Sequence, residues 1–133
     1  QGDATVIASG DTGAGIGGGG DGKGYGKVTI TDHANVTAWS EYGAGIGGGR
    51  YANGDIIISG DATVAAEAYN DSVAIGSGGQ LSNTDHLDTT ITISDRANVT
   101  AVGSGWRPAI GSRGNMTFSG GDSHPFTTTI NIL

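Results

Sequence analysis

Hydrophobic and polar residues alternate with a period of two in several short segments of the chain. Residues 28–31 (VTIT) show this pattern, and residues 34–38 (ANVTA) repeat it after a short polar junction at Asp32 and His33. Such alternation is typical of a β-strand that buries one face. The pattern therefore predicts pairs of short strands that are joined by tight polar turns.

These segments recur about every 30 residues, the repeat length of a stacked architecture. Residues 28–38 align with 56–66 and with 91–101, and a second motif, GAGIGGG at residues 13–19, returns unchanged at 43–49. Degenerate copies of the glycine motif follow at 73–78 and 108–112. One unit of three β-like pieces cannot bury its apolar face, whereas stacked units can. The predicted fold is therefore all-β, a right-handed parallel β-helix (β-solenoid) of four to five coils.

The repeats predict a single domain over residues 1–133, with coils that start near residues 13, 43, 72 and 108 and an enlarged loop at 80–88. Like residues should stack on one another from coil to coil. The predicted inward ladders are Ile16, Ile46, Ile75 and Ile110; Val28, Ile30, Ile56, Ile58, Ile91 and Ile93; and Val6, Val36, Val64 and Val99 with their flanking alanines. The glycine motif is expected to round a narrow corner against the neighbouring coil.

Composition and charge reduce the number of functions that the chain could have. Glycine supplies 27 of 133 residues and cysteine none, which excludes disulfides and thiol chemistry. The net charge of −7 disfavours binding to nucleic acid and to anionic membranes, because both usually require a basic face. No apolar run reaches the roughly 20 residues of a membrane span. We therefore expect neither nucleic-acid binding nor a membrane span.

The glycine motif followed by an alternating strand and then A-x-VTA resembles the glycine-rich repeats of secreted or wall-attached bacterial surface proteins. The motifs at residues 13–19, 28–38 and 43–49 carry this resemblance. It implies an extracellular or cell-surface location and an adhesin-like β-helical module, and it leaves the ligand open.

The two ends of the sequence match successive pieces of one repeat. Residues 1–8 match 59–66, and residues 127–133 match the piece that precedes such a segment. Uncapped ends of a β-solenoid expose unpaired backbone groups. We expect either flanking repeats of a longer chain or head-to-tail stacking of copies into a filament. The predicted edges are Ala4, Val6 and Ala8 at the N-terminal side, and Thr128, Ile130 and Ile132 at the C-terminal side.

Aromatic residues offer an alternative function. Four of them, Trp39, Tyr42, Tyr69 and Trp106, fall between an ANVTA-like piece and the next glycine motif. Stacked coils would bring them to one corner, where they either cover the coil or bind the faces of sugar rings. The sequence thus predicts a non-enzymatic structural module, with a carbohydrate-binding adhesin module as the alternative.

Catalysis and metal binding have less support in the sequence. His33 aligns with Asp61 and Arg96, so it occupies a variable corner position rather than that of a general base. We expect no enzymatic activity and no cofactor. Calcium is the weaker alternative, with Asp85 and Asp88 in the enlarged loop as candidate ligands.

Overall fold

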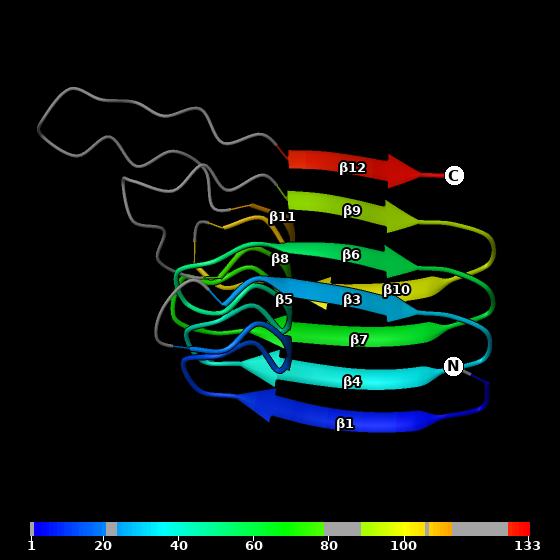
Figure 1. Ribbon diagram of the computed structural model, residues 1–133, viewed down its shortest axis with the longest axis horizontal. Coiled ribbons are helices and arrows are strands. Elements are labelled where there is room, and N and C mark those ends of the chain that lie inside the picture. Colours follow the sequence, from blue (N-terminus) through cyan, green and yellow to red (C-terminus); the bar gives the residue numbers. More distant parts are fainter. Residues whose placement is uncertain (1, 21–23, 79–88, 106, 113–127) are drawn as a thin grey trace, which may run out of the picture.

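Three parallel sheets wind around one apolar core in the computed structural model of the chain (Figure 1). The structure describes residues 2–20, 24–78, 89–105, 107–112 and 128–133. Within these ranges each sheet contains four strands, and the chain visits the sheets in turn, so that it makes one rung of three strands and then the next. The predicted parallel β-helix is confirmed.

The strands of each sheet lie in sequence order along the stack. Sheet 1 contains β1 (Thr5–Gly10), β4 (Asn35–Ser40), β7 (Thr63–Ala68) and β10 (Asn98–Val102). Sheet 2 contains β2 (Ile16–Gly17), β5 (Ile46–Gly47), β8 (Ile75–Gly76) and β11 (Ile110–Gly111). Sheet 3 contains β3 (Gly26–Ile30), β6 (Gly54–Ile58), β9 (Thr89–Ile93) and β12 (Thr128–Ile132).

The register between strands is the one that the repeats predict. In sheet 1, Val6 pairs with Val36, and Val36 with Val64. In sheet 2, Ile46 lies between Ile16 and Ile75. In these inward ladders, like side chains therefore lie on one another in successive rungs, about 4.8 Å apart. Together the ladders fill the core.

Burial follows the alternation of the sequence. In β4 every second residue is buried, and Val36 and Ala38 are only 3% and 1% exposed. The isoleucines of the middle rungs, Ile46 and Ile75, are fully buried. Within the described ranges there is no helix long and apolar enough to cross a membrane.

Two of the three corners of each rung recur at matched positions through the stack. The glycine corner lies at the ends of the sheet 2 strands and consists of Gly17, Gly47, Gly76 and Gly111. The charged corner joins sheet 3 to sheet 1 and consists of two stacked positions in each rung. Its first position holds Gly2, Asp32, Gly60 and Asp95, and its second position holds Asp3, His33, Asp61 and Arg96.

The glycine corner takes no other residue. At Gly47 φ is +134°, a conformation that L-residues rarely adopt. A Cβ on Gly47 would also overlap the carbonyl oxygen of Gly76 in the next rung. The expectation that the glycine motif rounds a narrow corner agrees with this geometry.

Candidate functional site

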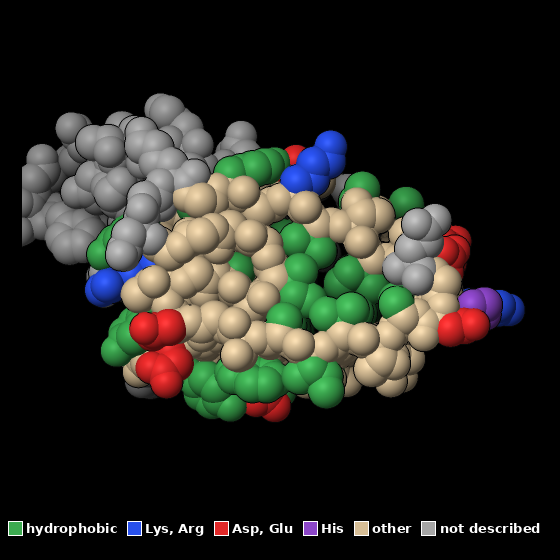
Figure 2. Space-filling model, turned by 60° about the horizontal axis from the view of Figure 1, so that its bottom comes forward, with side chains coloured by type: hydrophobic (Ala, Val, Ile, Leu, Met, Phe, Trp, Pro, Cys, Tyr) green, Lys and Arg blue, Asp and Glu red, His purple; other side chains and the backbone are tan. Residues whose placement is uncertain are grey.

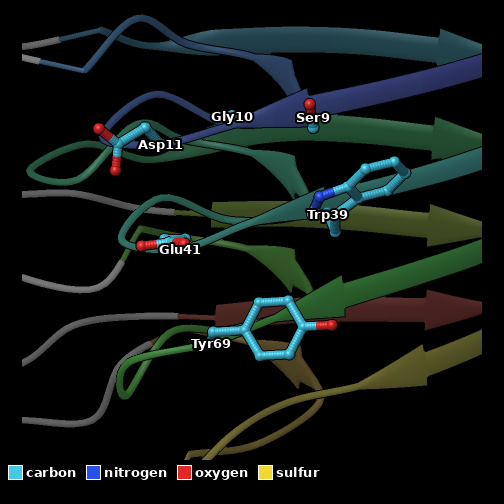
Figure 3. A pocket seen from close by; sticks show the side chains of 6 residues that line it. All are labelled: Ser9, Gly10, Asp11, Trp39, Glu41 and Tyr69. Atoms are coloured by element: carbon cyan, nitrogen blue, oxygen red, sulfur yellow. The ribbon is translucent and has the colours of Figure 1, made fainter.

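An open groove lies on the outer surface of sheet 1, where the strands run into the turns toward sheet 2. It has a volume of about 500 Å³ and is lined by Ser9, Gly10, Asp11, Trp39, Glu41 and Tyr69 (Figure 3). These residues come from three consecutive rungs. The groove is therefore a product of stacking, and no single repeat contains it.

Two columns of side chains build this groove. In the first column, Ser9 pairs with Trp39, and Trp39 pairs with Glu67 in β7. In the second column, backbone hydrogen bonds continue the parallel ladder beyond the strands, from Glu41 N–H to the Gly10 carbonyl (3.3 Å) and from Tyr69 N–H to the Ser40 carbonyl (3.0 Å). Asp11, Glu41 and Tyr69 are thus held one above another.

A buried serine fixes the turns that carry the two carboxylates. The Ser40 hydroxyl donates to the carbonyl oxygen of Gly13 in the rung below (2.7 Å) and accepts from the N–H of Gly43 (3.0 Å). Ser40 is fully buried, so its hydroxyl ties adjacent turns together inside the protein. The N–H of Tyr42 adds a bond to the Asp11 carbonyl (2.8 Å). These hydrogen bonds hold the turns of adjacent rungs together at the floor of the groove.

The groove combines aromatic surface with negative charge. The Trp39 ring lies between the levels of Ser9 and Tyr69, and the carboxylates of Asp11 and Glu41 lie to one side of it (Figure 3). Trp39 is 37% and Tyr69 is 47% exposed. The Tyr69 hydroxyl donates to Glu67 Oε2 (2.8 Å), and this hydrogen bond to a carboxylate raises the pKa of Tyr69. A flat ring beside carboxylate acceptors suits a polyhydroxylated ligand.

The structure brings together only part of the predicted aromatic set. Trp39 and Tyr69 share the groove, whereas Tyr42 lies under the guanidinium of Arg50, 5.2 Å from its ring centroid. Arg50 also lies 5.1 Å from the ring of Tyr51. Trp106 lies outside the described residues. Tyr42 therefore belongs to a separate cation–π cluster.

Sequence reasoning missed Ser9 and Asp11 as groove residues. Both lie one repeat before Trp39 and Glu41, so the alignment of the repeats already held the signal.

A second aromatic outside the groove, Tyr25, bonds to Asp55, and the carboxylate raises the pKa of Tyr25 to about 12.

The charged corner is the second cluster of titratable groups. Arg96 binds Asp61 through two contacts, Nε to Oδ1 (2.6 Å) and Nη2 to Oδ2 (2.7 Å). The hydrogen bonds from Arg96 lower the pKa of Asp61. His33 lies 3.7 Å from a carboxylate oxygen of Asp3 and 3.5 Å from one of Asp61. This cluster contains an ion pair between Asp61 and Arg96 of adjacent rungs, with the His33 ring beside Asp61.

The described part of the chain contains no cluster of side chains that could bind a metal ion. Among these residues no group of three or more His, Asp or Glu side chains comes together as a metal site. The candidate calcium ligands Asp85 and Asp88 lie outside the described residues.

The predicted edge residues lie on the outermost strands. Ala4 and Ala8 are half-buried at the N-terminal edge, where Val6 is 39% exposed. In β12, Thr128, Ile130 and Ile132 pair with Thr89, Ile91 and Ile93 of β9, and Ile132 is 76% exposed.

Comparison with known proteins agrees with this architecture. Residues 28–50 and 91–115 match the model of a family described as Beta helix repeat. Each match runs from a sheet 3 strand through the charged corner and sheet 1 to sheet 2. These matches support the parallel β-helix that the strands form. No match was found among curated proteins or among solved structures.

Proposed function

We propose that the chain is a non-enzymatic, extracellular structural module whose open β-helix ends stack head to tail on further copies of itself. The observation that carries the proposal is one ladder of sheet 1. Val36 and Val64 in the middle rungs are 3% and 1% exposed, whereas Val6 in the same ladder is 39% exposed. The ladder that forms the core is open at its end.

Apolar surface and unpaired backbone coincide at both ends. Figure 2 brings the β1 end of the stack forward, and apolar side chains gather in the middle of this view, surrounded by backbone and other side chains. Val6 of the inward ladder is 39% exposed at this end, and Ile132, which pairs with the inward Ile93, is 76% exposed at the opposite end. Edge strands of this kind pair readily with another strand. A further rung of the same fold would complete both the ladder and the hydrogen bonds.

A proline at Ile7 tests the stacking without breaking the fold. Asn35 N–H bonds to the Ala4 carbonyl (2.8 Å), so the even-numbered residues of β1 face β4 and the N–H of Ile7 faces the open edge. Ile7→Pro removes that donor and leaves the β1–β4 ladder intact. The matched control is Ile7→Thr, because Thr37 and Thr100 occupy this column in other rungs.

Sedimentation velocity over a concentration series, with negative-stain microscopy, measures the result. We expect the wild type and Ile7→Thr to form filaments with an axial repeat of about 20 Å, four rungs at about 4.8 Å each. Ile7→Pro should stay monomeric. A wild-type chain that is monodisperse and monomeric at high concentration contradicts stacking, and the open edges would then be filled by flanking repeats.

The groove favours a second function, carbohydrate binding. Its exposed Trp39 ring can stack on a sugar face, and Asp11 and Glu41 can accept hydrogen bonds from hydroxyls. The carboxylates select neutral or cationic sugars over acidic ones. On a glycan array, Trp39→Ala should abolish binding, while Tyr25→Ala, an exposed aromatic outside the groove, should retain it. Equal binding by both variants contradicts this function.

A further inference from the structure

The charged corner alternates between two chemistries from rung to rung. Its first position holds Gly2, Asp32, Gly60 and Asp95, all with φ between 60° and 72°. Each aspartate accepts a hydrogen bond from the glycine of the rung below, from Gly2 N–H to Asp32 Oδ2 and from Gly60 N–H to Asp95 Oδ2, both 3.0 Å. A glycine rung and an aspartate rung therefore form a bonded pair.

The second position alternates between acidic and basic residues. Asp3, His33, Asp61 and Arg96 follow one another along the stack, an acidic residue and then a basic one. His33 shows how the pattern works, because it lies between carboxylates of the rungs below and above, 3.7 Å from Asp3 and 3.5 Å from Asp61. The internal pattern is thus a basic side chain between two acidic ones.

The strands that leave the corner follow the same two-rung period. Residues 2–6 and 60–64 both read GDATV, whereas Asp32 and Asp95 begin segments that continue as ANV after the basic residue. The rungs therefore alternate between two types. The first type has Gly-Asp at the corner, before β1 and β7, and the second type has Asp followed by a basic residue, before β4 and β10. The described stack contains an even number of rungs, four in each sheet. A first-type rung is consequently the one that fits on β10.

Arg96 has its carboxylate partner on one side only within the described structure. It binds Asp61 in the rung below, while its side chain remains 83% exposed. At the opposite end the Asp3 side chain is 94% exposed, and its Oδ1 lies 3.7 Å from His33 Nδ1. The column of second positions thus ends in a basic residue, Arg96 beside Asp95, at one end and in an acidic residue at the other.

Resting on the proposed stacking, we propose that the β10 edge docks the β1 edge of a second copy in one register, with Asp3 of that copy against Arg96. This register places Val6 of the second copy on Val99, as Val6 lies on Val36 within one chain. The N–H of the second copy's Asp3 then donates to the Asp95 carbonyl, as the N–H of Asp61 does to the Asp32 carbonyl. The charge pair favours this register, because a partner that is shifted along the edge or reversed loses the contact between Asp3 and Arg96.

Two charge reversals test the contact. Asp3→Lys sets a lysine against Arg96 of the neighbouring copy, and Arg96→Glu sets a glutamate against Asp3. Each variant alone should associate about tenfold more weakly than the wild type at about 0.01 M salt, where exposed charges are least screened. An equimolar mixture should recover wild-type association, since each junction then joins opposite charges and the two variants alternate.

Controls separate the contact from the fold. Asp61→Asn removes the internal partner of Arg96 but leaves the junction intact, so its association should stay within about twofold of the wild type. Thermal unfolding of each variant shows whether the coil is retained.

The outcomes distinguish this contact from stacking itself. A wild type that does not associate contradicts the proposed function. A wild type that associates while both reversals associate equally well, or a mixture no better than either variant alone, leaves stacking in place and overturns the Asp3–Arg96 register.

Discussion

The glycine corner and the charged corner both turn the chain through positive φ, but they tolerate different residues. In the glycine corner φ is 133–138° and all four rungs hold glycine. In the charged corner φ is 60–72°, and glycine alternates with aspartate. The first corner is constant in sequence, and the second varies.

The difference comes from what each corner faces. At φ near 60° an aspartate is tolerated, and its carboxylate bonds to a neighbouring N–H. At Gly47 the carbonyl of the next rung occupies the space of any side chain. The glycine corner thus fixes the path of the coil, and the charged corner is free to carry ionic contacts between rungs.

The largest effect is expected at the glycine corner. Gly47→Ala places a Cβ against the Gly76 carbonyl at a φ that alanine rarely adopts, so we expect a loss of more than about 4 kcal/mol in the free energy of unfolding, or no folded protein. The matched control is Gly19→Ala, whose Cβ meets nothing within 4 Å and should change stability by less than about 0.5 kcal/mol. Urea denaturation compares the two. Equal stabilities would show that the glycine corner imposes no steric limit.

An intermediate effect is expected at Asp32. Asp32→Ala keeps a side chain at φ of 61° and removes the hydrogen bond to Gly2, so the free energy of unfolding should fall by about 1–2 kcal/mol. Asp32→Gly also removes that bond but adopts this φ without strain, and it should stay within about 0.5 kcal/mol of the wild type. If the alanine variant matches the glycine variant, the left-handed conformation places no demand on this corner.

The smallest effect concerns pH and Asp61. Arg96 lowers the pKa of Asp61 below its ordinary value of 3.8, so the ion pair stabilises the folded state above that value and is lost as the pH falls through the lowered pKa. Wild type and Asp61→Asn should therefore differ by a constant amount above about pH 5 and converge in more acidic solution. Melting temperatures across this range measure the difference, and parallel curves down to the most acidic pH would contradict it.

Much of the fold could be predicted because the alignment of the repeats gives the pairing of strands residue by residue. The alignment of residues 28–38 with 56–66 and 91–101 is the register of the sheets, since stacked rungs place like residues on one another. The isoleucine of each glycine motif was predicted to point inward, and Ile46 and Ile75 are fully buried. Both results follow from a period of two and a constant repeat.

The candidate groove could be predicted only in part. Trp39 and Tyr69 were expected together, but the sequence also grouped Tyr42 with them, and Tyr42 packs under Arg50 instead. Asp11 joined the groove through the continued backbone ladder beyond β1, a pairing that alternation does not specify.

The sequence by itself determined the coil, its inward ladders and the residue types at both corners, because stacked strands convert a linear repeat directly into spatial register. The tertiary structure alone decided which outward residues of different rungs meet. Their meeting depends on the turns between sheets 1 and 2, which the buried Ser40 hydroxyl and the bonds between neighbouring turns hold in place. The repeat aligns Asp11 with Glu41 and Ser9 with Trp39, but only the folded chain shows that these residues line one groove with Tyr69 while Tyr42 packs under Arg50.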